Sequence, residues 1–129
     1  MRLLARREHS QLELRRKLAV RHLDAAAMTT VLADLVEKGY QSDQRFAEVY
    51  VRQRAAAGYG PLRIKLELNE RGIAADLIDE YLDLSDEFWL DNALKVKQKK
   101  FGECEPNDFA TKAKQLRFLQ YRGFEINKL

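Results

Sequence analysis

The sequence contains few residues that carry chemistry. It has one cysteine, Cys104, and two histidines, His9 and His22. Because a single cysteine forms neither an internal disulfide nor a thiolate zinc site, we expect a reducing, cytoplasmic setting. Neither histidine has further ligands at metal spacing, so we expect no metal site and place both histidines at the surface or in turns.

Motifs for nucleotide chemistry and membrane insertion are missing as well. No Gly-x-x-x-x-Gly-Lys-Ser/Thr loop is present, which argues against ATP or GTP hydrolysis. Gly58-Tyr59-Gly60 starts like a dinucleotide-binding fingerprint, but Arg63 stands where the third glycine is needed. No apolar run approaches the ~20 residues that cross a bilayer, and the chain is charged too early for a signal peptide. We therefore expect no catalytic residue, no cofactor and no membrane contact, and a protein that is not an enzyme.

Glycine and proline are scarce, with six and two residues, and all eight lie between stretches whose apolar residues recur at helical spacing. No stretch alternates apolar and polar residues as a half-buried strand does. Ser10-Gln11-Leu12-Glu13 forms a capping box, and Asp24, Ser42 and Ser85 are suitable N-caps. The pattern predicts helices at residues 2–8, 11–22, 25–38, 43–57, 61–71, 75–83, 86–100 and 107–122, with the start of another at 125–129.

The net charge is only +3, but the charges are grouped along the chain. Residues 1–23 carry seven basic and two acidic side chains, and residues 52–65 carry four basic ones and no acid. Residues 74–91 carry seven acids and no base, and residues 95–100 carry four lysines. Such grouping predicts basic and acidic patches on the folded surface.

A motif recurs at intervals of about fifty residues. Arg21, Arg71 and Arg122 mark it, at spacings of 50 and 51 residues. Apolar residues recur three positions before each arginine, two after it and seven after it: Leu18, Leu68 and Leu119; Leu23, Ile73 and Phe124; Met28, Ile78 and Leu129. We call each set of equivalent residues a repeat column. Three apolar repeat columns and one arginine column at the same spacing indicate a structural repeat.

Each repeat would contain three helices, with the arginine in the turn after the second. We predict three domains: a first repeat at residues 1–41 with a shortened first helix, a second at 42–84, and a third at 85–129 with a truncated last helix. These short helices suggest a chain trimmed at both ends. The predicted fold is all-α, with tandem three-helix repeats stacked into an elongated, curved array that offers an extended surface to a partner.

The second helices carry basic residues at matching repeat positions. Lys114 and Arg117 share one helical face with Tyr121, because they are spaced at i, i+3 and i+7. Arg63 occupies the repeat position of Lys114, and Arg16 that of Arg117, which predicts one continuous basic strip.

Arginine binds carboxylates and phosphates through two parallel hydrogen bonds, so this strip suits an acidic protein or a nucleic acid. The predicted partner-binding residues are Arg63, Lys114, Arg117 and Arg122, with Arg52 and Arg54 as weaker candidates. The alternative is a set of ordinary surface arginines paired with local acids such as Glu67.

Several blocks of the sequence resemble RecX regulatory proteins. They are Ala5-Arg6-Arg7-Glu8-His9-Ser10 with Glu13-Leu14-Arg15-Arg16-Lys17-Leu18; Gly39-Tyr40 with Asp43-Gln44-Arg45-Phe46-Ala47; Gly58-Tyr59-Gly60-Pro61-Leu62-Arg63-Ile64 with Glu67-Leu68 and Arg71-Gly72-Ile73; and Lys114 with Arg117-Phe118-Leu119-Gln120-Tyr121-Arg122-Gly123-Phe124. Trp89 and Phe101-Gly102 also fit. The similarity runs in order over nearly the whole chain.

The resemblance implies tandem three-helix repeats and a bacterial, cytoplasmic regulator of the RecA recombinase. Members of this family bind RecA and its filament on single-stranded DNA, and they restrain filament growth, strand exchange and ATP hydrolysis without a cofactor. The resemblance thus implies the RecA filament as partner, with contact to single-stranded DNA secondary, and we expect a monomer.

Two other functions stay open from the sequence. One is a helical module that binds nucleic acid directly, although the low net charge and the acidic residues 74–91 argue against it. The other is a purely structural adaptor, which would have no effect on recombinase turnover.

Overall fold

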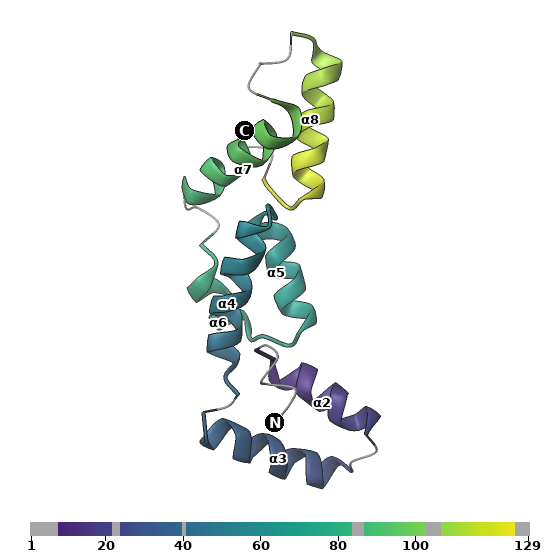
Figure 1. Ribbon diagram of the computed structural model, residues 1–129, viewed down its shortest axis with the longest axis vertical. Coiled ribbons are helices and arrows are strands. Elements are labelled where there is room, and N and C mark those ends of the chain that lie inside the picture. Colours follow the sequence, from purple (N-terminus) through teal and green to yellow (C-terminus); the bar gives the residue numbers. More distant parts are fainter. Residues whose placement is uncertain (1–7, 22–23, 40, 84–86, 103–106, 126–129) are drawn as a thin grey trace. The chain divides into compact units, whose positions relative to one another are not determined.

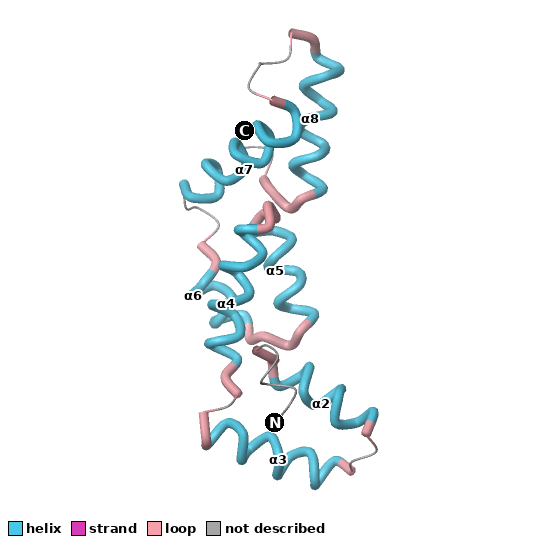
Figure 2. Tube along the Cα trace, in the orientation of Figure 1, coloured by secondary structure: helices cyan, strands magenta, loops and turns pink. Residues whose placement is uncertain are grey.

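The structure, a computed structural model, describes residues 8–21, 24–39, 41–83, 87–102 and 107–125. Regular structure within these residues is helical throughout, and Figure 2 shows helices and loops without a strand in the described part. The helices are α2 (Gln11–Val20), α3 (Ala25–Glu37), α4 (Asp43–Ala56), α5 (Pro61–Glu70), α6 (Ala75–Tyr81), α7 (Glu87–Phe101) and α8 (Phe109–Tyr121). The predicted all-α class is confirmed.

The observed helices begin and end within two residues of the predicted positions. The helices predicted at 2–8 and 125–129 fall outside the described residues except for Glu8 and Glu125, neither of which is helical. The predicted features at His22, Leu23, Ser85, Cys104 and Leu129 also lie outside the described residues.

Three predicted N-caps are present as hydrogen bonds. The Ser10 Oγ accepts the Glu13 amide at 3.1 Å, while the Glu13 Oε1 accepts the Ser10 amide at 3.1 Å, which completes the capping box. Asp24 Oδ1 accepts the Ala27 amide at 2.7 Å at the start of α3. Ser42 Oγ caps α4 by accepting the Arg45 amide at 3.1 Å. These side chains satisfy amides that have no acceptor within the helix.

Contacts within the chain group it into two compact units. The first contains Met1–Tyr50 and Leu68–Tyr81, and the second contains Val51–Glu67 and Leu82–Leu129. Helices α4 and α5 therefore contribute residues to both units. The units do not coincide with the predicted repeats, so the domains at 1–41, 42–84 and 85–129 stay a prediction.

The first unit has its core between α2 and α3, which lie side by side in Figure 1. Leu14 and Leu18 of α2 are buried with Leu32 and Leu35 of α3, and Met28 and Val31 pack against them. The spacing of these residues places them on one stripe of each helix, as an amphipathic pair requires.

A joint in the first unit connects the start of α2 to the turn after α5. The Ser10 hydroxyl donates to the Arg71 carbonyl at 2.8 Å. Gly72 follows with a φ of 78°, and a β-carbon there would stand 2.8 Å from the Leu12 side chain. The Arg71 Nε lies 3.7 Å from Glu13 Oε2, and its guanidinium lies 4.9 Å from the centre of the Tyr50 ring.

An equivalent joint occurs in the second unit, one repeat further along the chain. The amide of Gly60 donates to the Arg122 carbonyl at 2.7 Å, and the amide of Leu62 donates to the Gly123 carbonyl at 2.9 Å. The end of α8 thus supplies acceptors to the free amides at the start of α5, an approach visible in Figure 1. Ser10 and Gly60 are related by the repeat, as are Gly72 and Gly123, so the same two segments meet in both joints, through the Ser10 hydroxyl in the first and the Gly60 amide in the second.

Six residues of the apolar repeat columns are buried, and Met28 is partly buried. Leu18, Leu68 and Leu119 are all buried, as are Ile73, Phe124 and Ile78. In the second unit α7 and α8 lie against each other, and the rings of Phe101 and Phe118 meet edge to face at 5.3 Å. The apolar periodicity therefore identified residues that the fold buries.

The prediction that His9 lies at the surface or in a turn is wrong, since the residue is buried and no turn is formed at its position. His9 is 1% exposed, and its Nε2 lies 2.9 Å from the Lys17 ammonium. Its carbonyl accepts a hydrogen bond from the buried Gln41 side chain at 3.3 Å. One of these contacts comes from a residue thirty-two positions away, which no local pattern around residue 9 reveals.

The described residues contain no group of three or more His, Cys, Asp or Glu side chains placed to hold a metal ion. Among the described helices, none has both the length and the apolarity that crossing a membrane requires.

Candidate interaction site

Three of the predicted partner-binding arginines meet at one aromatic ring. The guanidinium carbons of Arg54, Arg63 and Arg122 lie 3.8, 4.6 and 4.9 Å from the centre of the Tyr59 ring. We call these four residues the Tyr59 cluster. The electron-rich face of an aromatic ring attracts cations, which offsets part of the repulsion between guanidinium groups this close together.

The Tyr59 cluster is assembled from three helix ends in the second unit. Arg54 lies in the last turn of α4, and Arg63 in the first turn of α5. Arg122 immediately follows α8 and is brought to α5 by the Gly60 hydrogen bond to its carbonyl. Tyr59 lies between α4 and α5, where its amide donates to the Arg54 carbonyl at 3.1 Å.

Glu67 on α5 neutralises part of the cluster. Its carboxylate accepts two hydrogen bonds from Arg54, at 3.1 Å from Nε and 2.8 Å from Nη2. It also lies 3.9 Å from the Arg63 Nε. The two bonds between Arg54 and Glu67 have the forked geometry in which arginine binds carboxylates most strongly. The pairing with Glu67 that the alternative expects is thus present for Arg54 and, at a longer distance, for Arg63, while the partner-binding role of both arginines stays a prediction.

Arg122 differs from the other two arginines. Its guanidinium lies over Tyr59 and 5.3 Å from the centre of the Phe118 ring, and it has no ion pair among the described residues. The equivalent arginine of the first joint, Arg71, has Glu13 as a partner. Arg63 stands at the repeat position of Glu13, so the second joint has a cation where the first has an anion. Positive charge is consequently in excess around Tyr59.

The basic face predicted on α8 adjoins the Tyr59 cluster. Lys114, Arg117 and Tyr121 are all exposed, and their spacing places them on one side of the helix. The Arg63 guanidinium lies 5.6 Å from the centre of the Tyr121 ring, which joins this face to the cluster. The fold thus brings five of the six predicted residues into one basic and aromatic surface, with Lys114 at its far end.

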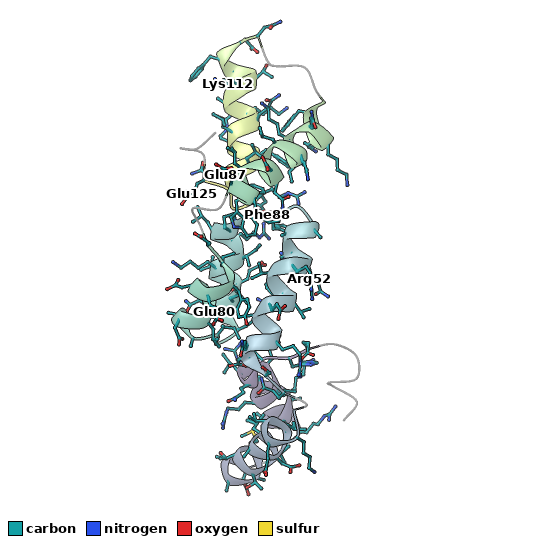
Figure 3. The ribbon with its side chains drawn as sticks, turned by 90° about the vertical axis from the view of Figure 1, so that its left-hand side faces the viewer. Arg52, Glu80, Glu87, Phe88, Lys112 and Glu125 are labelled. Atoms are coloured by element: carbon teal, nitrogen blue, oxygen red, sulfur yellow. The ribbon has the colours of Figure 1, made fainter. Side chains whose placement is uncertain are left out.

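Arg52 is the predicted residue that lies apart. It is exposed on α4, its side chain projects away from the helix in Figure 3, and no described contact joins it to Tyr59. Arg54, by contrast, lies in the cluster but is occupied by Glu67.

The predicted continuous basic strip is interrupted in the middle repeat. The position held by Arg16 and Arg117 is occupied there by Leu66, which is 58% exposed. The position held by Arg63 and Lys114 is occupied in the first repeat by Glu13. Of the three helices only α8 carries a basic residue at both positions, so the repeat does not build one continuous strip.

Sequence reasoning missed the role of Tyr59. An aromatic residue between two glycines, with arginines four to five positions away on either side, was an available signal. What the sequence does not indicate is that Arg122, more than sixty residues away, reaches the same ring.

Two family descriptions match the chain. The RecX second three-helix domain matches residues 42–82, and the RecX third three-helix domain matches residues 86–127. Regulatory protein RecX of Halorhodospira halophila is 44% identical over 129 residues, which cover 100% of this chain and 80% of that protein. Regulatory protein RecX of Pseudomonas putida is 42% identical over 129 residues, covering 100% of this chain and 83% of that protein. The chain belongs to the RecX family.

Solved structures of RecX proteins have the same fold. RecX from Lactobacillus salivarius superposes with a TM-score of 0.80 at 20% identity, covering 98% of this chain and 86% of that one. A second RecX crystal structure gives a TM-score of 0.77 at 21% identity, covering 97% of this chain and 63% of that one. Together with the family match, they support a helical array of three-helix repeats. The relatives' shared name makes this RecX chain a member of a family of regulatory proteins.

Proposed function

We propose that this RecX chain binds the RecA recombinase and its filament on single-stranded DNA, and inhibits filament extension, strand exchange and ATP hydrolysis. The observation that carries the proposal is the match to regulatory protein RecX over the whole chain. The chain acts without a cofactor or a catalytic step, as a monomer in the cytoplasm.

The basic and aromatic surface of the second unit supplies the contacts. Arg122 and Arg63 offer guanidinium groups at the Tyr59 cluster, and Lys114 and Arg117 extend the charge along α8. Carboxylates of the recombinase are the favoured acceptors, because arginine pairs with them through two hydrogen bonds. Arg54 contributes less because Glu67 holds it, and Arg52 lies at the margin.

The repeated joint of this chain suits a partner that is itself built from repeated subunits. The joint between a second helix and an arginine–glycine turn is built twice, so related surfaces recur along the chain. A filament also presents the same surface on each subunit. A repeat protein bound to neighbouring subunits would hinder both subunit addition and the rearrangements that accompany ATP turnover.

The test is RecA's DNA-dependent ATPase with a charge-reversed variant. Lys114→Glu with Arg117→Glu should abolish inhibition while the helical circular dichroism stays unchanged, because both side chains are exposed. The matched control is Lys95→Glu with Lys99→Glu, which makes the same charge change on exposed positions of α7. Equal inhibition by both variants would contradict the assignment of the surface.

Direct binding to nucleic acid is the second candidate, because arginines beside Tyr59 and Tyr121 resemble the cation and stacking groups that bind single strands. A salt titration with DNA, with and without RecA, separates the two. Binding to DNA alone through four phosphates would give a log–log slope of about −3. The proposed function predicts that affinity depends on RecA instead.

A further inference from the structure

Helix α5 exposes two leucines one turn apart. Leu62 is 42% exposed and Leu66 is 58% exposed, and their i, i+4 spacing places them on one face of the helix. Both lie in the second unit, where the amide of Leu62 is bonded to the end of α8. The pair forms an apolar ridge that no described residue covers fully.

The ridge is particular to the middle repeat. Leu66 stands at the position of Arg16 and Arg117, which are exposed and charged. A leucine is not needed at this position to fold the helix, since the other two repeats build it with arginine. The fold of the repeat thus does not require the apolar side chain, and exposed apolar patches with a polar rim are typical of protein interfaces.

Cations border the ridge on both sides. Lys65 is exposed and lies one turn after Leu62, and Arg63 lies one turn before Leu66. Tyr121, which is 76% exposed, lies beside Arg63 and leads to Arg117 on α8. The exposed carboxylate of Glu70 lies one turn beyond Leu66 and marks the end of the basic border.

We infer that the Leu62–Leu66 ridge is the docking site for an acidic amphipathic helix of the protein partner. Apolar side chains of that helix pack against the two leucines. The axes of the two helices then lie about 8–10 Å apart, as in helix pairs within proteins. The carboxylates of the docked helix pair with Arg63, Lys65 and Arg117. The cations favour a negatively charged partner. The two leucines favour a protein segment over a nucleic acid, because a phosphate backbone offers them no apolar surface. The inference rests on the proposed function, in which this partner is RecA.

The test measures the affinity for RecA filaments formed on single-stranded DNA with a slowly hydrolysed ATP analogue. Leu62→Ala with Leu66→Ala should weaken binding about tenfold or more at both low and high salt, since the lost contact is apolar. Leu66→Arg, which installs the residue type of the other repeats, should weaken binding similarly. The matched control is Leu90→Ala with Leu94→Ala, an exposed i, i+4 pair on α7 that should leave affinity unchanged.

Each outcome decides a different claim. If the wild-type chain binds and inhibits RecA but the Leu62/Leu66 variants bind equally well, the docking site is overturned and the proposed function stands. If the wild-type chain does not bind the filament, both are overturned. If the variants instead lose affinity for DNA without RecA, the ridge serves nucleic acid and the inference is wrong.

Discussion

A β-carbon added to Gly60 would stand 2.4 Å from the carbonyl carbon of Gly123, closer than real contacts of this kind allow. The two backbones meet because the end of α8 supplies carbonyl acceptors to the start of α5. This close approach also carries Arg122 to the Tyr59 ring. The joint that holds the second unit together therefore builds the candidate interaction site as well.

Gly123→Ala should destabilise the protein strongly. Gly123 has a φ of 99°, and a β-carbon there would lie 2.4 Å from the Arg63 β-carbon, so backbone strain and a steric clash act together. We expect a loss of more than about 3 kcal/mol in the free energy of unfolding, measured by chemical denaturation. Gly102→Ala is the control: its φ is 86° but nothing lies within 4 Å, so about 1–2 kcal/mol of strain is expected. Equal losses would show that the close approach does not matter.

Ser10→Ala should cost more than an ordinary helix cap. The Ser10 hydroxyl is fully buried, accepts the Glu13 amide and donates to the Arg71 carbonyl, so its loss removes a cap and a contact of the first joint. We expect about 2–3 kcal/mol in thermal or denaturant unfolding. Asp24→Ala removes an exposed cap alone and should cost about 1 kcal/mol. If the two losses are the same, the bond to Arg71 contributes nothing.

Local signals explain how much of the fold the sequence predicts. The Ser10 capping box, the Asp24 cap and the glycines that end helices act within a few residues, so helix positions follow from sequence alone. The repeat columns identify core residues such as Leu68 and Leu119, because each repeat buries the same faces. Contacts between distant segments are not encoded locally, and the burial of His9 at the first joint was missed for that reason.

Glu67→Gln should free the arginines of the Tyr59 cluster. Loss of the forked ion pair with Arg54 should cost about 1–2 kcal/mol in unfolding free energy. Under the proposed function, affinity for the RecA filament should rise several-fold at low salt and less at high salt, because an internal competitor for the partner's carboxylates is removed. Glu80→Gln makes the same charge change at an exposed position of α6, in the unit that does not hold the Tyr59 cluster, and should alter neither stability nor affinity much. Weaker binding by Glu67→Gln would mean that the ion pair orients the arginines for the partner.

Gln115→Leu should stabilise the protein. Gln115 is 5% exposed, its Oε1 accepts no hydrogen bond from the part of the chain that the structure describes, and it occupies the repeat position of the buried Leu14 and Ile64. Replacing a buried unpaired amide with leucine should add about 1 kcal/mol to the free energy of unfolding. Gln120→Leu changes an exposed position of the same helix and should have little effect. A loss of stability in Gln115→Leu would indicate that the amide is satisfied in solution.

The candidate site was predicted in part. Basic residues on the second helices pointed to Arg63, Lys114, Arg117 and Arg122, and the fold brings Arg63 and Arg122 to one ring. The sequence could not show that Tyr59 organises them or that Glu67 occupies Arg54, because these contacts depend on side-chain direction. The sequence itself shows that Leu66 stands where the basic strip needs a cation. Only the structure shows that this leucine is exposed and so belongs to the surface.

We propose that this RecX chain regulates RecA by acting on its filament. The most direct measurement is the ATPase of RecA on single-stranded DNA with the wild-type chain added at far fewer copies than RecA. We expect substantial inhibition at this ratio, because blocking subunit addition requires contact with few filament sites. No inhibition, or inhibition only when the chain matches RecA in amount, would contradict it.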